Sequence, residues 1–421
     1  MTTEPLPKSR PPSAAPAGRF ARLWAAYTVN VAGDEFYVLA VPLIVYQVGG
    51  TASAMSLVYA CALLPQVFTG VWGGVLADRQ DRVRLLRLCH LCSALALLLA
   101  YAVFSATHVS VGGLAVIAVL LGLMAPVAAA SFDSALPHFV PHHALPRANA
   151  ATEASRTACV VLGPAAAGFA VSRLAPEQAV LINSVSFVVA YLLLHRITSP
   201  ARPVEPARGG LASQWRDLAT GMRYLVTGDT AVRVGVLTST VVNFVFGAYE
   251  PMVVYRMQHD LGLGADTVGL VFAASGVTSV AIALLLSWRA PSRGYLVVMG
   301  LSVALQGAAV AGLGVLTSLG AVVIAQIAFA TGTVLYTVYW RAMRQTVVPG
   351  ELLGRVAGTC RSIAYGGAFL GSAVSAVVLG RFLGVDTALL FAGLASTALG
   401  AIVAVCGRTG TAPGQSGRDA P

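Results

Sequence analysis

Lysine, and charged residues in general, are scarce in this sequence. Only 10% of the 421 residues are charged and 57% are hydrophobic, which is too apolar for a single soluble core. Lys8 is the single lysine, so the chain has no phosphate-binding Gly-x-x-x-x-Gly-Lys loop and is not by itself an ATP-driven pump. The protease motif His-Glu-x-x-His and the hydrolase motif Gly-x-Ser-x-Gly are also missing. We therefore expect an integral membrane protein that is not an enzyme and has no cofactor.

Cysteine and histidine are too scattered to predict a metal site. All six cysteines fall in or beside apolar runs, where they pack as small apolar residues. Cys89 and Cys92 have the spacing of a zinc-binding pair but lack a second pair of ligands. His138, His142 and His143 cluster in a hydrophilic stretch, where a solvated loop is favoured over a metal site.

Twelve apolar runs have about the length that a helix needs to cross a bilayer. We therefore predict an all-α membrane protein with about twelve transmembrane helices. No cleavable signal is predicted before the first run, because the residues that precede it are polar and rich in proline. The predicted spans are 22–47, 53–76, 88–107, 111–135, 149–172, 179–195, 230–255, 266–288, 295–315, 319–340, 357–380 and 387–406.

Arginines are concentrated in alternate loops and in both tails. Loops 79–87 and 196–223 are examples, whereas the opposite loops hold only Arg173, Arg256 and Arg381. Short loops rich in arginine stay in the cytoplasm, so both termini are predicted to be cytoplasmic. This bias also accounts for the net charge of +10. Nucleic acid is not an expected partner, because its binding would need those charges on one folded surface.

The second half of the chain repeats the first. Residues 42–46 (PLIVY) match 251–255 (PMVVY) at an offset of 209, and residues 140–163 share several positions with 348–371 at an offset of 208. A third match joins the second and eighth spans at an offset of 213. Nearly constant offsets indicate two pseudo-symmetric six-helix halves around a central cleft.

Five segments are predicted from these patterns. Disordered tails at 1–18 and 407–421 enclose an N-terminal half at 19–195, a cytoplasmic linker at 196–229 and a C-terminal half at 230–406. The linker begins with a flexible stretch rich in proline and glycine. It continues as an amphipathic helix that is expected to lie along the cytoplasmic membrane surface. The apolar face of this helix comprises Leu211, Trp215, Leu218, Met222 and Leu225.

A charged stretch at 73–86 separates the second and third spans. Its order of residues resembles the loop between the second and third helices of the major facilitator superfamily, whose pattern is Gly-x-Leu-Ala-Asp-Arg-x-Gly-Arg. Asp81 stands where the family has its second glycine, and the corresponding stretch of the second half, 288–294, has no aspartate. The residues that match the pattern include Gly74, Asp78, Arg79 and Arg82.

The resemblance implies a cytoplasmic gate. In the family, the aspartate of this loop docks against the start of the eleventh helix and holds the cytoplasmic side shut while the cleft faces outward. Here that start is Gly354, where Arg355 and Arg361 add charge to the free amides of the first helical turn. We therefore expect Asp78 to stabilise the state that is closed to the cytoplasm.

Ionisable residues inside the predicted spans are candidates for proton coupling, because a charge in hydrocarbon is costly. Asp34 and Glu35 lie near the middle of the first span, and at least one must face the cleft or another helix, since successive residues cannot share a helix face. Carboxyls in a low-dielectric site can load and release protons near neutral pH. A buried protonated carboxyl with a hydroxyl partner is the structural alternative. The repeat places Asn243 opposite Asp34, and Glu250 follows two turns later.

The fifth span contains both an ion pair and a second motif. Glu153 and Arg156 have the spacing of a helical i,i+3 pair, which a structural role explains as well as a functional one. The repeat maps Glu153 onto Arg361, so these opposite charges are a candidate gate between the halves. The fourth span has no arginine, the basic residue that many proton antiporters carry there, and Arg156 is the nearest substitute.

Further along the fifth span, residues 161–168 resemble the Gly-Pro-x-x-Gly-Gly antiporter motif of facilitator drug exporters. Gly163, Pro164 and Gly168 match it, and Ala167 replaces one glycine. Close helix packing explains these small residues equally well. Together with the 136–149 stretch and the charged loop, the motif resembles the macrolide-efflux and siderophore-exporter type of the superfamily.

The expected function is export across a bacterial cytoplasmic membrane. The cargo is expected to be a small, partly apolar organic compound, exchanged for protons by a monomer that alternates access between its halves. Substrate, protons and lipid are the expected partners. An uptake symporter or facilitator is the alternative within transport, and a membrane receptor or scaffold that moves nothing is the alternative outside it. No motif identifies the substrate.

Overall fold

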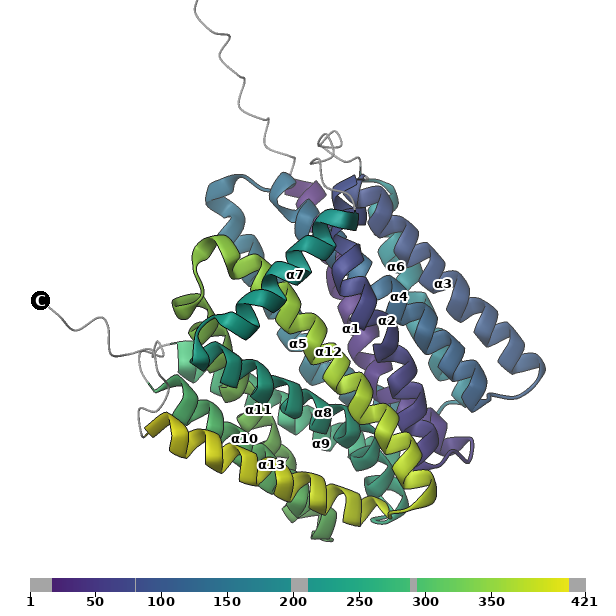
Figure 1. Cartoon of the computed structure of the whole chain (residues 1–421). Helices are drawn as coiled ribbons and strands as arrows, with labels where there is room; N and C mark the ends of the chain where they lie inside the picture. The colour runs from purple at the N-terminus through teal and green to yellow at the C-terminus, as the bar shows by residue number, and fades with distance from the viewer. Residues whose placement is uncertain (1–16, 80, 198–210, 288–293, 409–421) are drawn as a thin grey trace, which may run out of the picture.

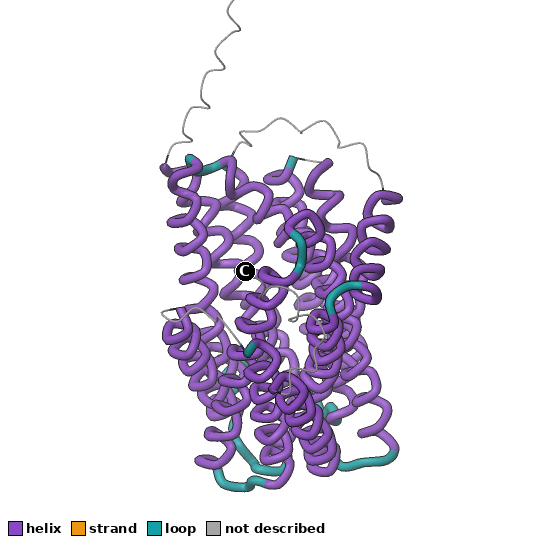
Figure 2. The backbone as a smooth tube through the Cα atoms, turned by 60° about the vertical axis from the view of Figure 1, so that its left-hand side comes forward, coloured by secondary structure: helices purple, strands orange, loops and turns teal. Residues whose placement is uncertain are grey.

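The structure is a computed structural model that describes residues 17–79, 81–197, 211–287 and 294–408. Within these residues it consists of helices and short connections, without strands (Figures 1 and 2). For residues 17, 69–79, 211–215 and 379–381 only the backbone is described. The predicted all-α fold is confirmed.

The N-terminal half contains six long helices, and polar caps define where several of them begin. Asp81 caps α3, where its carboxylate accepts hydrogen bonds from the amides of Val83 and Arg84 at 2.9 and 3.0 Å. The aspartate that replaces the family's second glycine therefore starts a helix. The elements are α1 (Ala17–Gln47), α2 (Ala52–Arg79), α3 (Arg82–Ala106), α4 (Val111–Ala135), the short turns η1 (Leu136–His138) and η2 (His142–Ala144), α5 (Leu145–Val171) and α6 (Pro176–His195).

The C-terminal half repeats this layout. Ser110 caps α4 and Ser318 caps α11, at the offset of 208 that the sequence repeat predicts. The repeat is therefore present in the structure as well as in the sequence. The elements are α7 (Leu211–Thr227), α8 (Thr230–His259), α9 (Ala265–Ser287), α10 (Tyr295–Val315), α11 (Leu319–Val347), α12 (Gly350–Arg381) and α13 (Val385–Arg408).

Ten of the described helices are long and apolar enough to cross a membrane. The two other predicted spans fall in α2 and α12, which contain 28 and 32 residues. The protein is thus a multi-pass membrane protein. The limits assigned to the tails, the linker and the two halves stay predictions, and residues 1–16, 198–210 and 409–421 lie outside the described residues.

The two halves share a core on one side of the molecule only. We call the side where α1 begins and α13 ends the terminal side, and the opposite side the far side. On the far side a single buried cluster joins both halves through residues such as Ile44 of α1 and Val253 of α8. On the terminal side the halves have separate clusters, one around Phe132 and the other around Trp340.

Hydrogen bonds between the halves also lie on the far side. The hydroxyls of Ser56 and Ser375 are 2.9 Å apart, and Ser372 donates to the backbone oxygen of Ser56 at 2.6 Å. Tyr46 of α1 donates to the backbone oxygen of Gln258 in α8 at 3.3 Å. These contacts join α2 to α12, which pack side by side, and α1 to α8 (Figure 1). The structure is therefore sealed on the far side and open on the terminal side.

The helix α7 lies across the terminal ends of both halves, in contact with α2 and α12 (Figure 1). It covers the residues predicted to form an amphipathic linker helix, whose place along the cytoplasmic membrane surface stays a prediction. Its packing differs from the expected one: Leu225 is buried against Val356 and Cys360, whereas Met222 is 43% exposed. Since Asp217 also pairs with Arg355 at 2.8 Å, this part of α7 packs on protein and not only on the membrane surface.

Candidate functional site

A cavity of about 800 Å³, the N-terminal cavity, lies between the helices of the first half and α12. Asp34 and Glu35 both line it, so the successive carboxyls of α1 face the same space. Asp34 accepts a hydrogen bond from the amide of Asn30, one turn earlier, at 2.8 Å. Asp133 of α4 and Arg361 of α12 complete its charged lining.

A second cavity of about 800 Å³, the C-terminal cavity, lies within the second half. Asn243 lines it, so the repeat-equivalent residues Asp34 and Asn243 face corresponding cavities in their own halves. Arg361 lines both cavities and marks where they adjoin. The predicted cleft is therefore present as two adjoining cavities that differ in charge.

Glu250 lies close to the carboxyl pair of α1 without lining either cavity. Its carboxyl is near enough to Glu35 to interact electrostatically, and Glu35 interacts in the same way with Asp34 and with Arg156 of α5. The hydroxyl of the adjacent Tyr249 donates to the side-chain oxygen of Gln326. Glu35 is thus the residue at which acids of both halves come together.

The small residues of α5 fix the position of this acidic group. A β-carbon at Gly163 would lie 2.7 Å from the β-carbon of Glu35, too close for any side chain. A β-carbon at Gly168 would clash with the backbone oxygen of Ala265 in α9. The backbone oxygen of Pro164 in α5 faces Gly269 in α9. The motif therefore lets α5 touch α1 at the carboxyls and α9 across the interface between the halves.

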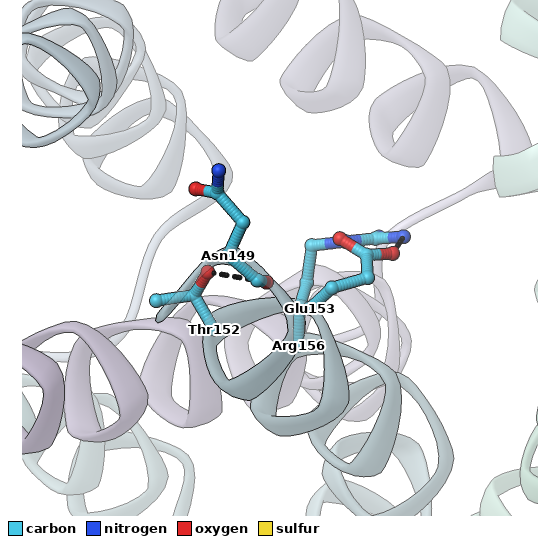
Figure 3. A network of polar contacts seen from close by, with 4 residues as sticks. All are labelled: Asn149, Thr152, Glu153 and Arg156. Atoms are coloured by element: carbon cyan, nitrogen blue, oxygen red, sulfur yellow. Dashed lines mark hydrogen bonds and ion pairs between the residues drawn. The ribbon is translucent and has the colours of Figure 1, made fainter. Parts of the chain in front are cut away.

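Glu153 and Arg156 form the predicted ion pair through two hydrogen bonds. Arg156 Nη2 lies 2.7 Å from Glu153 Oε1, and Arg156 Nε lies 3.1 Å from Oε2. The side chains are 62% and 48% exposed, respectively. Figure 3 shows the pair projecting from a different side of α5 than Asn149 and Thr152, which are joined by their own hydrogen bond of 2.9 Å.

Each charge of the predicted gate has a different cross-half neighbour from the expected one. Glu153 interacts electrostatically with Arg341 of α11, and Arg361 interacts with Asp133 of α4. The repeat offset of 208 relates Asp133 to Arg341 and Glu153 to Arg361. The two cross-half pairs are therefore symmetry mates. We call these four residues the charge quartet; Asp133 and Arg341 were not among the residues predicted from the sequence, although the same offset relates them.

The charged loop is described only in part. Gly74, Asp78 and Arg79 lie where side chains are not described, so the predicted docking of Asp78 stays a prediction. Arg82 follows the loop and forms a side-chain contact with His138 of η1. Arg355, the expected neighbour of Asp78, is paired with Asp217 of α7.

Two pseudo-symmetric helical halves, sealed on one side and enclosing cavities that open on the other, define a membrane transporter fold. A family model described as Major Facilitator Superfamily matches residues 23–246, more than half of the chain. The chain belongs to the Major Facilitator Superfamily, a family of membrane transporters and not of enzymes. The resemblance drawn from the charged loop is confirmed.

Curated relatives align with most of the chain. The multidrug efflux pump Tap of Mycobacterium tuberculosis is 26% identical over 368 residues, which cover 84% of each protein. The uncharacterized MFS-type transporter YfiS of Bacillus subtilis is 24% identical over 395 residues, covering 91% of this chain and 92% of YfiS. The identities are low, but the alignments run through both halves.

Solved structures share the fold. The nucleoside transporter NupG has a TM-score of 0.72 at 11% identity, covering 93% of this chain and 98% of NupG. A bacterial homologue of the iron transporter ferroportin in its inward-facing state has a TM-score of 0.70 at 16% identity, with 92% and 98% coverage. At these identities the likeness concerns the fold alone.

Proposed function

We propose that this transporter exports a small, partly apolar organic compound from a bacterial cell in exchange for protons. The observation that carries the proposal is that Asp34 and Glu35 line one cavity from the middle of α1. Carboxyls that share a low-dielectric site are suited to exchanging protons with water near neutral pH. The open terminal side is the cytoplasmic side in this proposal, in accord with the arginine-rich loops.

The cavity walls fit a partly apolar cargo. Val31, Leu121 and Met124 line the N-terminal cavity beside its polar groups. Each cavity, at about 800 Å³, lies within the range of about 300 to 1,000 Å³ that is usual for small-molecule sites. The relative Tap, a multidrug efflux pump that is 26% identical to this chain, supports export over uptake.

Arg156 offers a route from proton binding to gating. It holds Glu153 by two hydrogen bonds and also interacts with Glu35. When Glu35 loses its proton, its charge draws Arg156 away from Glu153, which is then free to engage Arg341 and close the terminal side. When Glu35 is protonated, Arg156 returns to Glu153 and the terminal side opens. This sequence matches an exchange in which proton release accompanies the outward step.

Alternating access then needs contacts to be exchanged between the two sides. Closing the terminal side brings Asp133 toward Arg361 and Glu153 toward Arg341, while the far-side contacts of Tyr46 must separate. Since the far-side bonds are few and neutral, a modest gain from charge pairs on the terminal side is enough to balance them.

The proposal is tested first with a panel of inhibitory compounds. Cells that overproduce the protein should tolerate at least one compound better than cells without it, and Asp34→Asn or Glu35→Gln should abolish that protection. In proteoliposomes, the same compound should move against its gradient when a proton gradient is imposed, in the wild type but not in these variants. Glu177→Gln, at the far-side start of α6, is the matched acidic control.

Two results would contradict the proposal. If flux followed the pH gradient in Asp34→Asn and in Glu35→Gln as it does in the wild type, these carboxyls would not be the groups that couple transport to protons. Accumulation of the compound in the compartment that protons enter would instead favour the alternative, an uptake symporter.

A further inference from the structure

The two cavities are lined by charges of opposite sign. Three carboxyls, from Asp34, Glu35 and Asp133, line the N-terminal cavity, and its one arginine, Arg361, is shared with the other. The C-terminal cavity has three arginines in its lining and, among the described residues, no aspartate or glutamate. This asymmetry is not explained by proton coupling, which uses only the acidic wall.

The arginines of the C-terminal cavity are Arg341, Arg344 and Arg361. Within the part of the chain that the structure describes, none of them has a carboxylate within 4.0 Å. Arg341 and Arg361 belong to the charge quartet and have distant acidic neighbours in the other half. Arg344 is half-buried, and its Nε atom is buried without a hydrogen-bond partner in the structure. The buried Nε atom is out of reach of the cavity, and the side chain also contacts Cys360. Because the guanidinium lines the cavity without a carboxylate partner, its other nitrogens are the ones suited to bind an anion.

Aromatic packing holds Arg344 in place. Its guanidinium carbon lies 4.8 Å from the centre of the Trp340 ring, which is itself buried in the core of the second half. An arginine that is fixed in this way loses little further freedom when its planar fork binds a carboxylate or phosphate group. Positive charges on the walls of a concave site also attract anions from solution.

The remaining lining suits the rest of such a ligand. Gln306 is buried and accepts a hydrogen bond of 3.4 Å from Thr333, and both line the C-terminal cavity with Asn243. Phe246 and Tyr336 add aromatic surface to the same lining. The cavity thus combines an anion-binding end with amide and hydroxyl groups and an apolar wall.

We propose that the C-terminal cavity binds an anionic group, a carboxylate or a phosphate, of the compound that the protein transports. The cargo is then an organic anion or a zwitterion with an apolar body. This inference rests on the proposed transport function, which it deepens. Arg344 holds the anion, and Arg341 and Arg361 attract it while the terminal side is open. On closure these two arginines turn to Glu153 and Asp133, which leaves the ligand to Arg344.

The test uses three probes with one aromatic body: naphthalene-2-carboxylate, naphthalene-2-carboxamide and 2-naphthylmethylammonium. Binding to the purified full-length protein in nanodiscs is measured by equilibrium dialysis. The carboxylate should bind at least about tenfold more tightly than the other two. Arg344→Gln should abolish this preference and Arg344→Lys should retain part of it, because lysine keeps the charge without the planar fork. Arg341→Gln, at an exposed position, should weaken binding of the carboxylate without disturbing the core.

A matched variant and a lipid titration serve as controls. Arg233→Gln removes an exposed charge of α8 outside the cavity and should leave the preference unchanged. Equal binding of the three probes, or an unchanged preference in Arg344→Gln, would overturn the inference. Carboxylate binding that vanishes when phosphatidylglycerol is added to neutral nanodiscs would assign the site to a lipid headgroup and overturn the cargo assignment. Selective binding without proton-driven flux would refute the proposed exchange and leave the anion site standing.

Discussion

The charge quartet predicts which contacts stabilise the terminal side when it closes, and the Asp133–Arg361 pair is its clearest test. Both side chains line the N-terminal cavity from opposite halves. Neither has an ion-pair partner within 4.0 Å among the described residues, so reversing one charge breaks no existing bridge there. We expect Asp133→Arg or Arg361→Asp alone to favour the open state, and the double exchange to restore closure.

The size of the effect follows from the exposure of the two groups. Both side chains are exposed in the open state, so their contact on closure resembles a surface ion pair, worth about 0.2 to 1 kcal/mol. Reversing one charge replaces attraction by repulsion of similar size, a change of about 0.4 to 2 kcal/mol. Since about 1.4 kcal/mol corresponds to a factor of ten, the open population should rise relative to the closed one by roughly 2- to 30-fold. Added salt should reduce the difference.

Spin-label distances across the terminal side measure this population. Labels at His142 of η2 and Glu351 of α12 lie at exposed positions of opposite halves. The label is attached through introduced cysteines in a background where the exposed native cysteines, Cys92 and Cys406, are replaced by serine. Each single reversal should shift the distance distribution toward the longer component, and the double exchange should return it to the wild-type distribution.

The predicted outcome differs from that of a direct Glu153–Arg361 gate. If those two residues were partners, exchange of Glu153→Arg with Arg361→Glu would restore closure, whereas Arg361 has Asp133 as its electrostatic neighbour across the halves. A double exchange of Asp133 and Arg361 that is no better than the worse single change would refute our reasoning, because the coupling energy between the two positions would then be zero.

Two other predictions concern packing and the charged loop. Gly163→Ala should push α1 away from α5 and lower the thermal unfolding midpoint, at a cost of about 1 to 3 kcal/mol in stability. Gly366→Ala is the matched control, because a β-carbon there meets nothing within 4 Å, and it should be neutral or stabilising. An equal effect of both changes would contradict the packing argument. Asp78→Asn should raise the population that is open on the terminal side without impairing membrane insertion, as the same spin labels would report; an unchanged distribution would show that this loop does not control the gate.

The fold was predictable because membrane spans and repeats leave strong local signals. A span needs only length and apolarity, so most predicted spans end within a few residues of helices in the structure. The repeat is read from sequence identity alone, and the residues that it relates, Asp34 and Asn243, each line the cavity of their own half. These features depend on local composition or on alignment, and neither requires knowledge of which face each helix turns toward the protein interior.

The site was predictable only in part, because it depends on which face each helix turns toward the interior. The sequence indicated that Asp34 or Glu35 faces the cleft or another helix, and in the structure both line the N-terminal cavity. Asp133 lies inside the predicted span 111–135 but close to its end, where nothing local distinguishes it from a carboxyl of the loop that follows. The packing of α7 on α12 was also missed, since its apolar face predicts burial without specifying whether lipid or protein covers it.

The electrostatic neighbours of Glu153 and Arg361 show how a repeat constrains contacts across the interface. Residues at equivalent positions are related by the pseudo-two-fold axis, so they meet only if they lie close to that axis. Tyr46 and Tyr255 do, and their ring centres are 6.0 Å apart on the far side. A residue away from the axis does not meet its own equivalent in the other half, but a different residue that lies near that equivalent. The symmetry then repeats the same contact once more on the other side of the axis. Glu153 therefore faces Arg341, because its equivalent Arg361 faces Asp133. A gate placed off the axis therefore needs two pairs. Both are available here because arginines stand in the second half at the positions equivalent to Asp133 and Glu153 of the first.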